Sequence, residues 1–224
     1  MENSSQTASI HSFDIAGPAG RLESLLNAGA PDAPYAALVC HPHPMGGGTM
    51  HNKVVYHAMK AMSRMGFPVL RFNFRGTGRS EGTHDDGRGE QEDVRAALDW
   101  LEDAFHRPIL FAGFSFGANV GMRVCCGDAR IPGVIALGLP VAAEGRHYTY
   151  KYLPDCSKPK LFISGDHDQY GPVAEVEAVV RTAPDPKELV WIAGADHFFA
   201  GKLDQVQTAI TDWVERNFLT AGGR

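Results

Sequence analysis

Short apolar runs alternate along this chain with longer stretches whose apolar residues recur every three or four positions. The short runs predict buried strands at residues 35–40, 67–74, 109–111, 133–139, 160–165 and 188–192. The longer stretches predict helices at residues 52–65, 91–105 and 173–181 and in a closing segment around residues 203–218. Strands that alternate with helices favour βαβ units and therefore a mainly parallel sheet with helices on both faces.

The N-terminal part of the chain has a different pattern. Residues 9–15 and 21–27 predict two strands joined at residues 17–20, where glycine and proline favour a tight hairpin turn. With the six runs above, the prediction is an α/β sheet of about eight strands. Residues 1–7 are polar, and we expect them to be disordered. The length of 224 residues fits a single domain over residues 1–224.

Composition and charge narrow the classes of partner. The chain is 44% hydrophobic and 21% charged with a formal net charge of -5, which gives no support for binding to nucleic acid or to an anionic membrane. No apolar run approaches the roughly 20 residues that a membrane span needs. The first ten residues, MENSSQTASI, lack the basic and apolar segments of a signal peptide, so we expect a cytoplasmic protein.

The four cysteines show no regular spacing. Cys125 and Cys126 are adjacent in a predicted helix, and Cys40 and Cys156 lie far from them in the sequence. Because this pattern does not form a disulfide framework, we expect reduced thiols.

Residues 108–121, PILFAGFSFGANVG, contain the clearest chemical motif. A short apolar strand leads into Gly113-Phe-Ser115-Phe-Gly117, and a run of small residues able to start a helix follows. Glycine at both flanking positions permits a sharp strand-to-helix turn, because a side chain there would collide with neighbouring backbone. Such a turn raises the serine hydroxyl above the sheet edge, beside a helix N-terminus. This G-x-S-x-G pattern is a nucleophile elbow and makes Ser115 the candidate nucleophile.

A serine nucleophile needs a histidine base and a group that orients it. His197 follows the last strand in the sequence GADHFF, where a loop can reach the elbow. The loop 165–172 offers two acids, Asp166 and Asp168, and physical reasoning alone gives only a small preference for Asp168. Asp196 adjoins His197, but neighbouring loop side chains seldom face one another, so we expect it to be structural. The order of serine, acid and histidine is the one found in α/β-hydrolases.

The tetrahedral intermediate of such a reaction needs two hydrogen-bond donors. The N–H of Phe116, directly after the nucleophile, supplies the first. The second is expected in the loop after the strand at residues 35–40, with the sequence HPHPMGGG. Pro42 and Pro44 have no N–H, which leaves His43 or Met45.

Five motifs in order, HPHPMGGG, FNFRGTGRSEG, GFSFG, GDHD and GADHFF, make the chain resemble an α/β-hydrolase of the compact, lidless group near dienelactone hydrolases and small carboxylesterases. The resemblance covers nearly the full length. It implies that Asp168 is the acid, that His43 is the second donor, and that no cofactor is required. Dienelactone hydrolases carry cysteine as nucleophile, so Ser115 favours ester hydrolysis. The expected substrate is a small-molecule ester, with a thioester or a small peptide as alternatives.

The stretch between the strand that ends near Leu139 and the strand after Lys158 is roughly eighteen residues long. Lipases of this fold usually insert their cap here, and this stretch is too short for a helical cap. We therefore expect an open site without a cap domain.

The sequence leaves two other classes of function open. His41-x-His43 with His51 nearby resembles the start of a metal-dependent hydrolase site, but the aspartate of that pattern is absent, so we expect no metal. A non-catalytic scaffold that retains the triad residues is the second class. The sequence does not indicate the oligomeric state.

Overall fold

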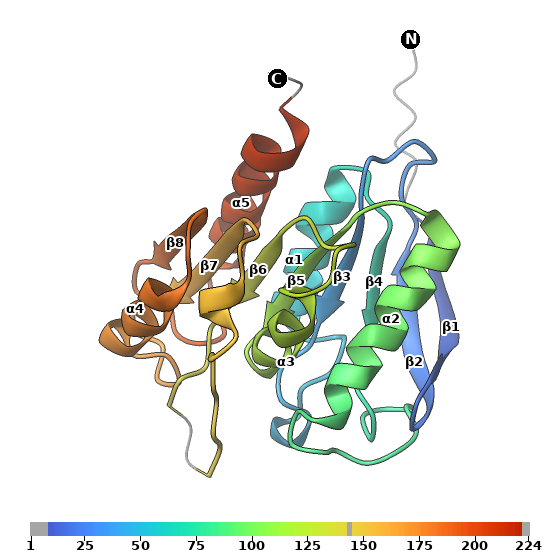
Figure 1. Ribbon diagram of the computed structural model, residues 1–224, viewed down its shortest axis with the longest axis horizontal. Helices are drawn as coiled ribbons and strands as arrows, with labels where there is room; N and C mark the ends of the chain where they lie inside the picture. The colour runs from blue at the N-terminus through green and yellow to red at the C-terminus, as the bar shows by residue number, and fades with distance from the viewer. Residues whose placement is uncertain (1–8, 143–144, 221–224) are drawn as a thin grey trace.

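The computed structural model describes residues 9–142 and 145–220, so the expectation for residues 1–7 lies outside the described part. One eight-stranded sheet runs through the described residues, in the spatial order β1-β2-β4-β3-β5-β6-β7-β8 (Figure 1). The strands are β1 (Ile10–Gly17), β2 (Gly20–Asn27), β3 (Ala36–Cys40), β4 (Val69–Phe72), β5 (Ile109–Phe114), β6 (Val134–Leu137), β7 (Lys160–Gly165) and β8 (Lys187–Ile192).

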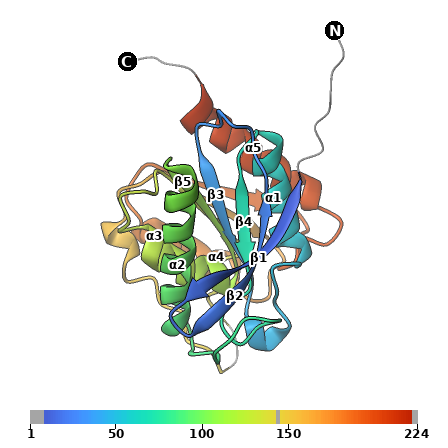
Figure 2. The same cartoon turned by 90° about the vertical axis from the view of Figure 1, so that its right-hand side faces the viewer.

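The sheet is mostly parallel, as the sequence predicts. Strands β3 to β8 run parallel to one another, whereas β2 pairs antiparallel with both β1 and β4. Strands β1 and β2 form the expected hairpin, in which Gly17 is opposite Gly20. Figure 2 shows this hairpin at the sheet edge nearest the viewer, beside β4.

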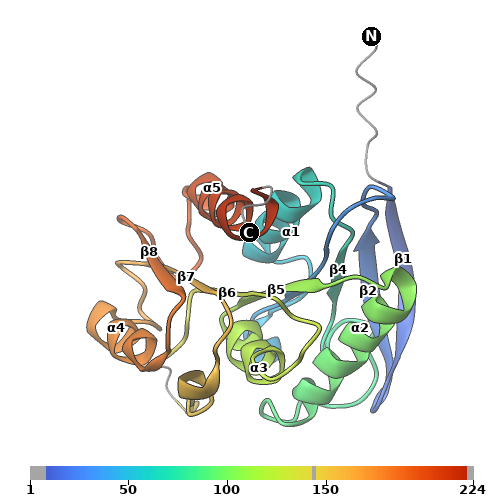
Figure 3. The same ribbon diagram turned by 45° about the horizontal axis from the view of Figure 1, so that its top comes forward.

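Helices cover both faces of the sheet (Figure 3). Helices α1 (Lys53–Arg64) and α5 (Leu203–Val214) pack on one face. Helices α2 (Gly89–Phe105), α3 (Phe116–Cys125) and α4 (Val173–Thr182) lie on the other. A five-residue π-helical turn, Glu215–Leu219, extends α5. The apolar residues that recur every three or four positions in the sequence therefore form the helix faces that pack against the sheet.

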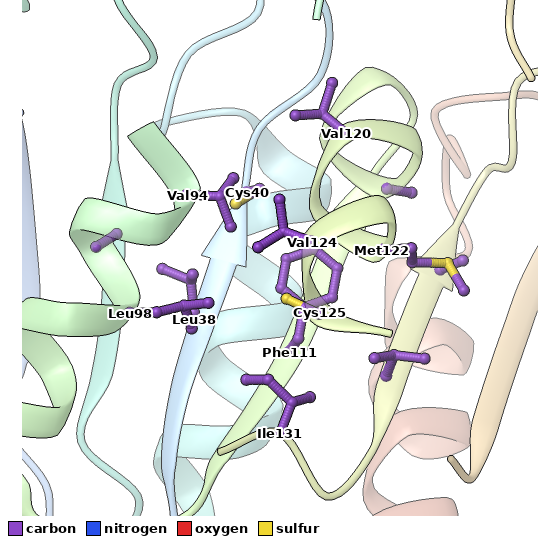
Figure 4. Packing of buried hydrophobic residues seen from close by; sticks show 14 of the residues in the cluster. Leu38, Cys40, Val94, Leu98, Phe111, Val120, Met122, Val124, Cys125 and Ile131 are labelled. Carbon is purple, nitrogen blue, oxygen red and sulfur yellow. The ribbon is translucent and has the colours of Figure 1, made fainter. Parts of the chain in front are cut away.

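A hydrophobic core lies on each face of the sheet, and alternate residues of each central strand point into one core or the other. In β3, Leu38 packs under α2 and α3, whereas Val39 points to the face covered by α1 and α5. Figure 4 shows Leu38 and Phe111 of neighbouring strands against Leu98 of α2 and Val124 of α3. Burial of a leucine or phenylalanine contributes about 1.5–3 kcal/mol, so these contacts hold the helices rigidly on the sheet.

The direction in which successive strands are added to the sheet reverses at β3, although β3, β4 and β5 all run parallel. From β3 the chain passes through α1 to β4 on one side, and then returns through α2 to β5 on the other side of β3. In such a sheet, ligands bind in the crevice outside the carboxyl ends of the two strands at the reversal. The loops that follow Cys40 and Phe114 meet at this crevice.

The described residues of the segment between β6 and β7, 138–142 and 145–159, form no helical cap. Their one helical element is the three-residue 3₁₀ turn Leu153–Asp155. None of the helices within the described ranges is long and apolar enough to cross a membrane.

The expectation of reduced thiols is wrong for one pair of cysteines. Cys126, at the C-terminal end of α3, forms a disulfide with Cys156, and their Cα atoms are 5.1 Å apart. Successive residues of a helix point about 100° apart, so Cys125 is buried in the core as a free thiol while Cys126 faces the β6–β7 segment. Two cysteines that are adjacent in the sequence can therefore differ, with Cys126 in a disulfide and Cys125 a free thiol.

Candidate active site

Ser115 lies at the turn between β5 and α3, where the sequence predicts the elbow. Its backbone has φ 55° and ψ -119°, a conformation that non-glycine residues rarely adopt and that costs about 1–3 kcal/mol. The Ser115 N–H donates to the carbonyl oxygen of Leu137 at 2.9 Å, which ties the turn to β6. The strained turn places the serine at the carboxyl edge of the sheet, directly before the N-terminus of α3.

The two flanking glycines allow close backbone approach, as expected. A Cβ at Gly113 would lie 2.5 Å from the carbonyl oxygen of Gly117, inside the turn itself. A Cβ at Gly117 would lie 2.5 Å from the carbonyl oxygen of His41. The start of α3 is thus packed directly against the loop that follows β3.

His197 bridges the serine and an acid. Its Nε2 lies 2.9 Å from Oγ of Ser115, and its Nδ1 lies 2.8 Å from Oδ2 of Asp168. All three side chains are buried, with His197 3% and Asp168 4% exposed. A carboxylate beside Nδ1 favours the tautomer with the proton on that nitrogen, which leaves Nε2 able to accept the serine proton.

Backbone groups fix the Asp168 carboxylate. Its Oδ1 accepts hydrogen bonds from the N–H groups of Tyr170 and Gly171, at 2.7 Å and 3.1 Å. The other oxygen is thereby directed at His197. The tight turn after β7 therefore determines the orientation of the imidazole.

The two other candidate acids lie away from the imidazole. Asp166 is exposed, and its Oδ1 accepts the Gly194 N–H at 2.6 Å. This bond joins the loops after β7 and β8, and so differs from the local turn that is typical of aspartate at a strand end. Asp196 accepts from the N–H groups of Phe198 and Ala200, at 3.1 Å and 3.0 Å, and so stabilises the turn that carries His197.

The two predicted oxyanion donors come from neighbouring segments. Phe116 is the first residue of α3, so its N–H belongs to the set that an α-helix leaves without a partner inside the helix. His43 precedes the short 3₁₀ turn Pro44–Gly46, and its ring lies 4.7 Å from the Phe116 ring. The Met45 N–H, the alternative donor, is engaged by Nδ1 of His43 at 3.1 Å. This contact leaves the His43 N–H as the better candidate.

A cavity of about 120 Å³ opens beside Ser115. Among its lining residues are His43, Asn52, Arg146, Tyr148 and His197. Desolvation by burial, followed by the positive charge of Arg146, lowers the pKa of His43 to about 4. At neutral pH the ring is therefore uncharged, and the bond that Nδ1 accepts from Met45 places the ring proton on Nε2.

Similarity to known proteins agrees with this geometry. A model of the α/β hydrolase domain family matches residues 36–216. The chain belongs to this family. An α/β serine hydrolase homologue from Coxiella burnetii is 38% identical, with a TM-score of 0.83 over 90% of this chain and 96% of that one. XC6422 from Xanthomonas campestris, an α/β serine hydrolase without lid, is 34% identical, with a TM-score of 0.85 over 96% of this chain and 97% of its own. Protein RP471 of Rickettsia prowazekii is 38% identical over 88% of this chain and 86% of its own length.

His41 of this hydrolase has a structural position. It is fully buried, its Nε2 accepts the Phe74 N–H at 3.0 Å, and its Nδ1 lies 2.6 Å from the Pro42 carbonyl oxygen. Both ring nitrogens are thus engaged with backbone, so His41 cannot form the metal pair with His43 that its spacing suggested. Residues 9–142 and 145–220 contain no cluster of three or more histidine, cysteine or acidic side chains able to hold a metal ion.

Sequence reasoning missed several residues beside the hydrolase site. The ring of His84 lies 4.8 Å from that of His43, and its Nδ1 lies 2.7 Å from Oε1 of the buried Glu90. Arg146 and Tyr148 reach the cavity from the segment between β6 and β7. No motif marks these positions, because only the path of the folded loop brings them to the serine.

Proposed function

We propose that this α/β-hydrolase cleaves small carboxylic esters through an acyl-enzyme formed on Ser115. The observation that carries the proposal is a hydrogen-bonded chain of three side chains. Ser115 lies 2.9 Å from His197, and His197 lies 2.8 Å from Asp168. A serine hydroxyl is a weak nucleophile until a base removes its proton, and here His197 is the base and Asp168 orients it.

The reaction follows from the positions of these groups. The Ser115 oxygen attacks the ester carbonyl carbon while Nε2 of His197 takes the hydroxyl proton, and Asp168 stabilises the imidazolium. The N–H groups of His43 and Phe116 stabilise the negative oxygen of the tetrahedral intermediate. The C–O bond to the alcohol then breaks, and His197 returns its proton to the leaving oxygen. A water molecule, deprotonated by His197, attacks the acyl-enzyme and releases the acid and free Ser115.

The size of the cavity supports a short substrate. Its volume of about 120 Å³ is well below the roughly 300–1,000 Å³ of sites that hold drug-sized ligands. The described residues of the β6–β7 segment form no cap, so the site lies open to small soluble esters. A thioesterase or a small-substrate peptidase would use the same groups and remains the alternative.

A substrate panel tests the proposal. Purified enzyme is assayed with p-nitrophenyl esters of increasing acyl length, with acyl-CoA thioesters and with aminoacyl amides, and Ser115→Ala serves as the matched control. We expect the highest kcat/KM for short esters and no turnover above background by the variant. A kcat/KM for thioesters or amides that exceeds that for every ester would assign the enzyme to the alternative class.

A further inference from the structure

Among the described residues that line the cavity beside Ser115, Arg146 is the one arginine or lysine. No aspartate or glutamate of the described residues lines this cavity. The described lining of the cavity is therefore positive, whereas the chain as a whole has a net charge of -5. A cavity with an arginine and no carboxylate favours an anionic group on the substrate.

Three neighbours locate the Arg146 guanidinium at the wall of this cavity. Its Nη2 lies 3.8 Å from the position that a Cβ would take at Gly46, on the loop after β3. Its charge contributes to the lowered pKa of His43. It also opposes the rise that burial causes in the pKa of the Tyr148 hydroxyl. The guanidinium therefore lies between the loop after β3 and Tyr148, at the wall of the cavity that holds the serine.

Among the described residues, the acids nearest to the cavity have other partners. The Asp168 carboxylate is directed at His197 and held by two backbone N–H groups. Asp86 lines a neighbouring cavity that Arg146 also lines, and its carboxylate lies 3.5 Å from Nε2 of His84. Within residues 9–142 and 145–220, Arg146 forms no ion pair. The N-terminus of α3 adds its own positive potential beside Ser115.

We propose that the preferred ester carries a carboxylate in addition to the ester group, and that Arg146 binds this carboxylate. The proposal rests on ester hydrolysis as the function and adds a substrate class to it. A planar guanidinium can donate two parallel hydrogen bonds to a carboxylate, so Arg146 would fix both the charge and the orientation of the substrate. Because Arg146 takes no part in breaking the ester bond, this contact acts mainly on KM.

Two pairs of esters test the proposal and identify the part that carries the charge. Monomethyl glutarate and methyl glutaramate differ only in a carboxylate or a neutral amide on the acyl part. Acetoxyacetate and acetoxyacetamide differ in the same way on the alcohol part. Hydrolysis is followed by titration of the released acid, with p-nitrophenyl acetate as a neutral reference. In at least one pair we expect a KM about 10- to 100-fold lower for the anion, the effect of one charge-assisted hydrogen bond.

Substitutions then assign the effect to Arg146. Arg146→Gln should remove the discrimination by raising KM for the anion relative to its neutral partner, and Arg146→Lys should restore part of it. Arg181→Gln removes the same charge from the exposed C-terminal turn of α4 and should leave the discrimination intact. Added salt should raise KM for the anion alone.

Three outcomes are decisive. Equal KM values within both pairs for the wild-type enzyme overturn the proposal. Discrimination that survives in Arg146→Gln overturns the role of this residue. If the wild-type enzyme hydrolyses none of these esters, including the neutral reference, the proposed esterase function fails, and the assignment of a carboxylate ester fails with it.

Discussion

Asp168 and Asp166, two residues apart on one loop, should respond in opposite ways to the same substitution. In Asp168→Asn the amide oxygen can keep both backbone bonds, to the N–H groups of Tyr170 and Gly171. Turning the amide round would leave both N–H groups facing a donor, at about 1–3 kcal/mol each, so the oxygen stays where it is. The amide nitrogen then faces His197 and donates to Nδ1, which moves the ring proton to Nε2.

A proton on Nε2 removes the base from Ser115. In serine proteases with the same arrangement, this change of tautomer lowers kcat by about 10⁴-fold, and we expect a similar loss here with little change in melting temperature. Asp166→Asn is the matched control. It keeps an oxygen for the Gly194 N–H but loses the charge, so it should cost about 0.5–1.5 kcal/mol of stability and leave kcat near the wild-type value.

The assay compares kcat on p-nitrophenyl acetate with the melting temperature for each variant. If Asp166→Asn is the inactive variant and Asp168→Asn only melts earlier, the assignment of the acid is reversed. If both variants keep full activity, no carboxylate of this loop orients His197, and the mechanism above is wrong.

Three further predictions concern access, the disulfide and pH. Without a cap, the rate on a long-chain ester should not rise sharply above its critical micelle concentration, and such a rise would contradict the open site. Reduction of Cys126–Cys156, which closes a loop of 30 residues, should lower the free energy of unfolding by about 3–4 kcal/mol, measured by denaturant titration with and without dithiothreitol. Burial lowers the pKa of His41 to about 4, so the unfolded chain binds the extra proton and stability falls as pH drops. Between pH 7 and pH 5 the wild-type enzyme should therefore lose about 2 kcal/mol more than His41→Gln, and equal losses would show that His41 is not held neutral.

The sequence predicted the elements of the fold closely, because buried parallel strands are nearly continuous apolar runs between turn residues. The strand predicted at residues 160–165 has those bounds in the structure. Differences arise where backbone geometry overrides hydrophobicity. The strand expected at residues 133–139 ends at Leu137, since Gly138 has φ +53°. The strand expected at residues 109–111 continues to Phe114, because Gly113 still pairs with Cys40.

The candidate site was predictable only where a motif records local geometry. The elbow around Ser115 and the loop of His197 are such cases, because their spacing reflects the turn itself. The choice between Asp166 and Asp168 depends on the path of the loop after β7, so physical reasoning from sequence gives only a small preference for Asp168. Arg146, and the pairing of Cys126 with Cys156, depend on contacts between segments distant in sequence, for which a single sequence carries no signal.

Covalent labelling shows directly whether Ser115 is the nucleophile. Enzyme treated with a fluorophosphonate is digested, and the modified residue is located by mass spectrometry, in parallel with esterase assays of the wild-type enzyme and Ser115→Ala. We expect a single adduct on Ser115, loss of turnover in proportion to labelling, and neither adduct nor turnover in the variant. An adduct on another residue, or full esterase activity in Ser115→Ala, would contradict this expectation.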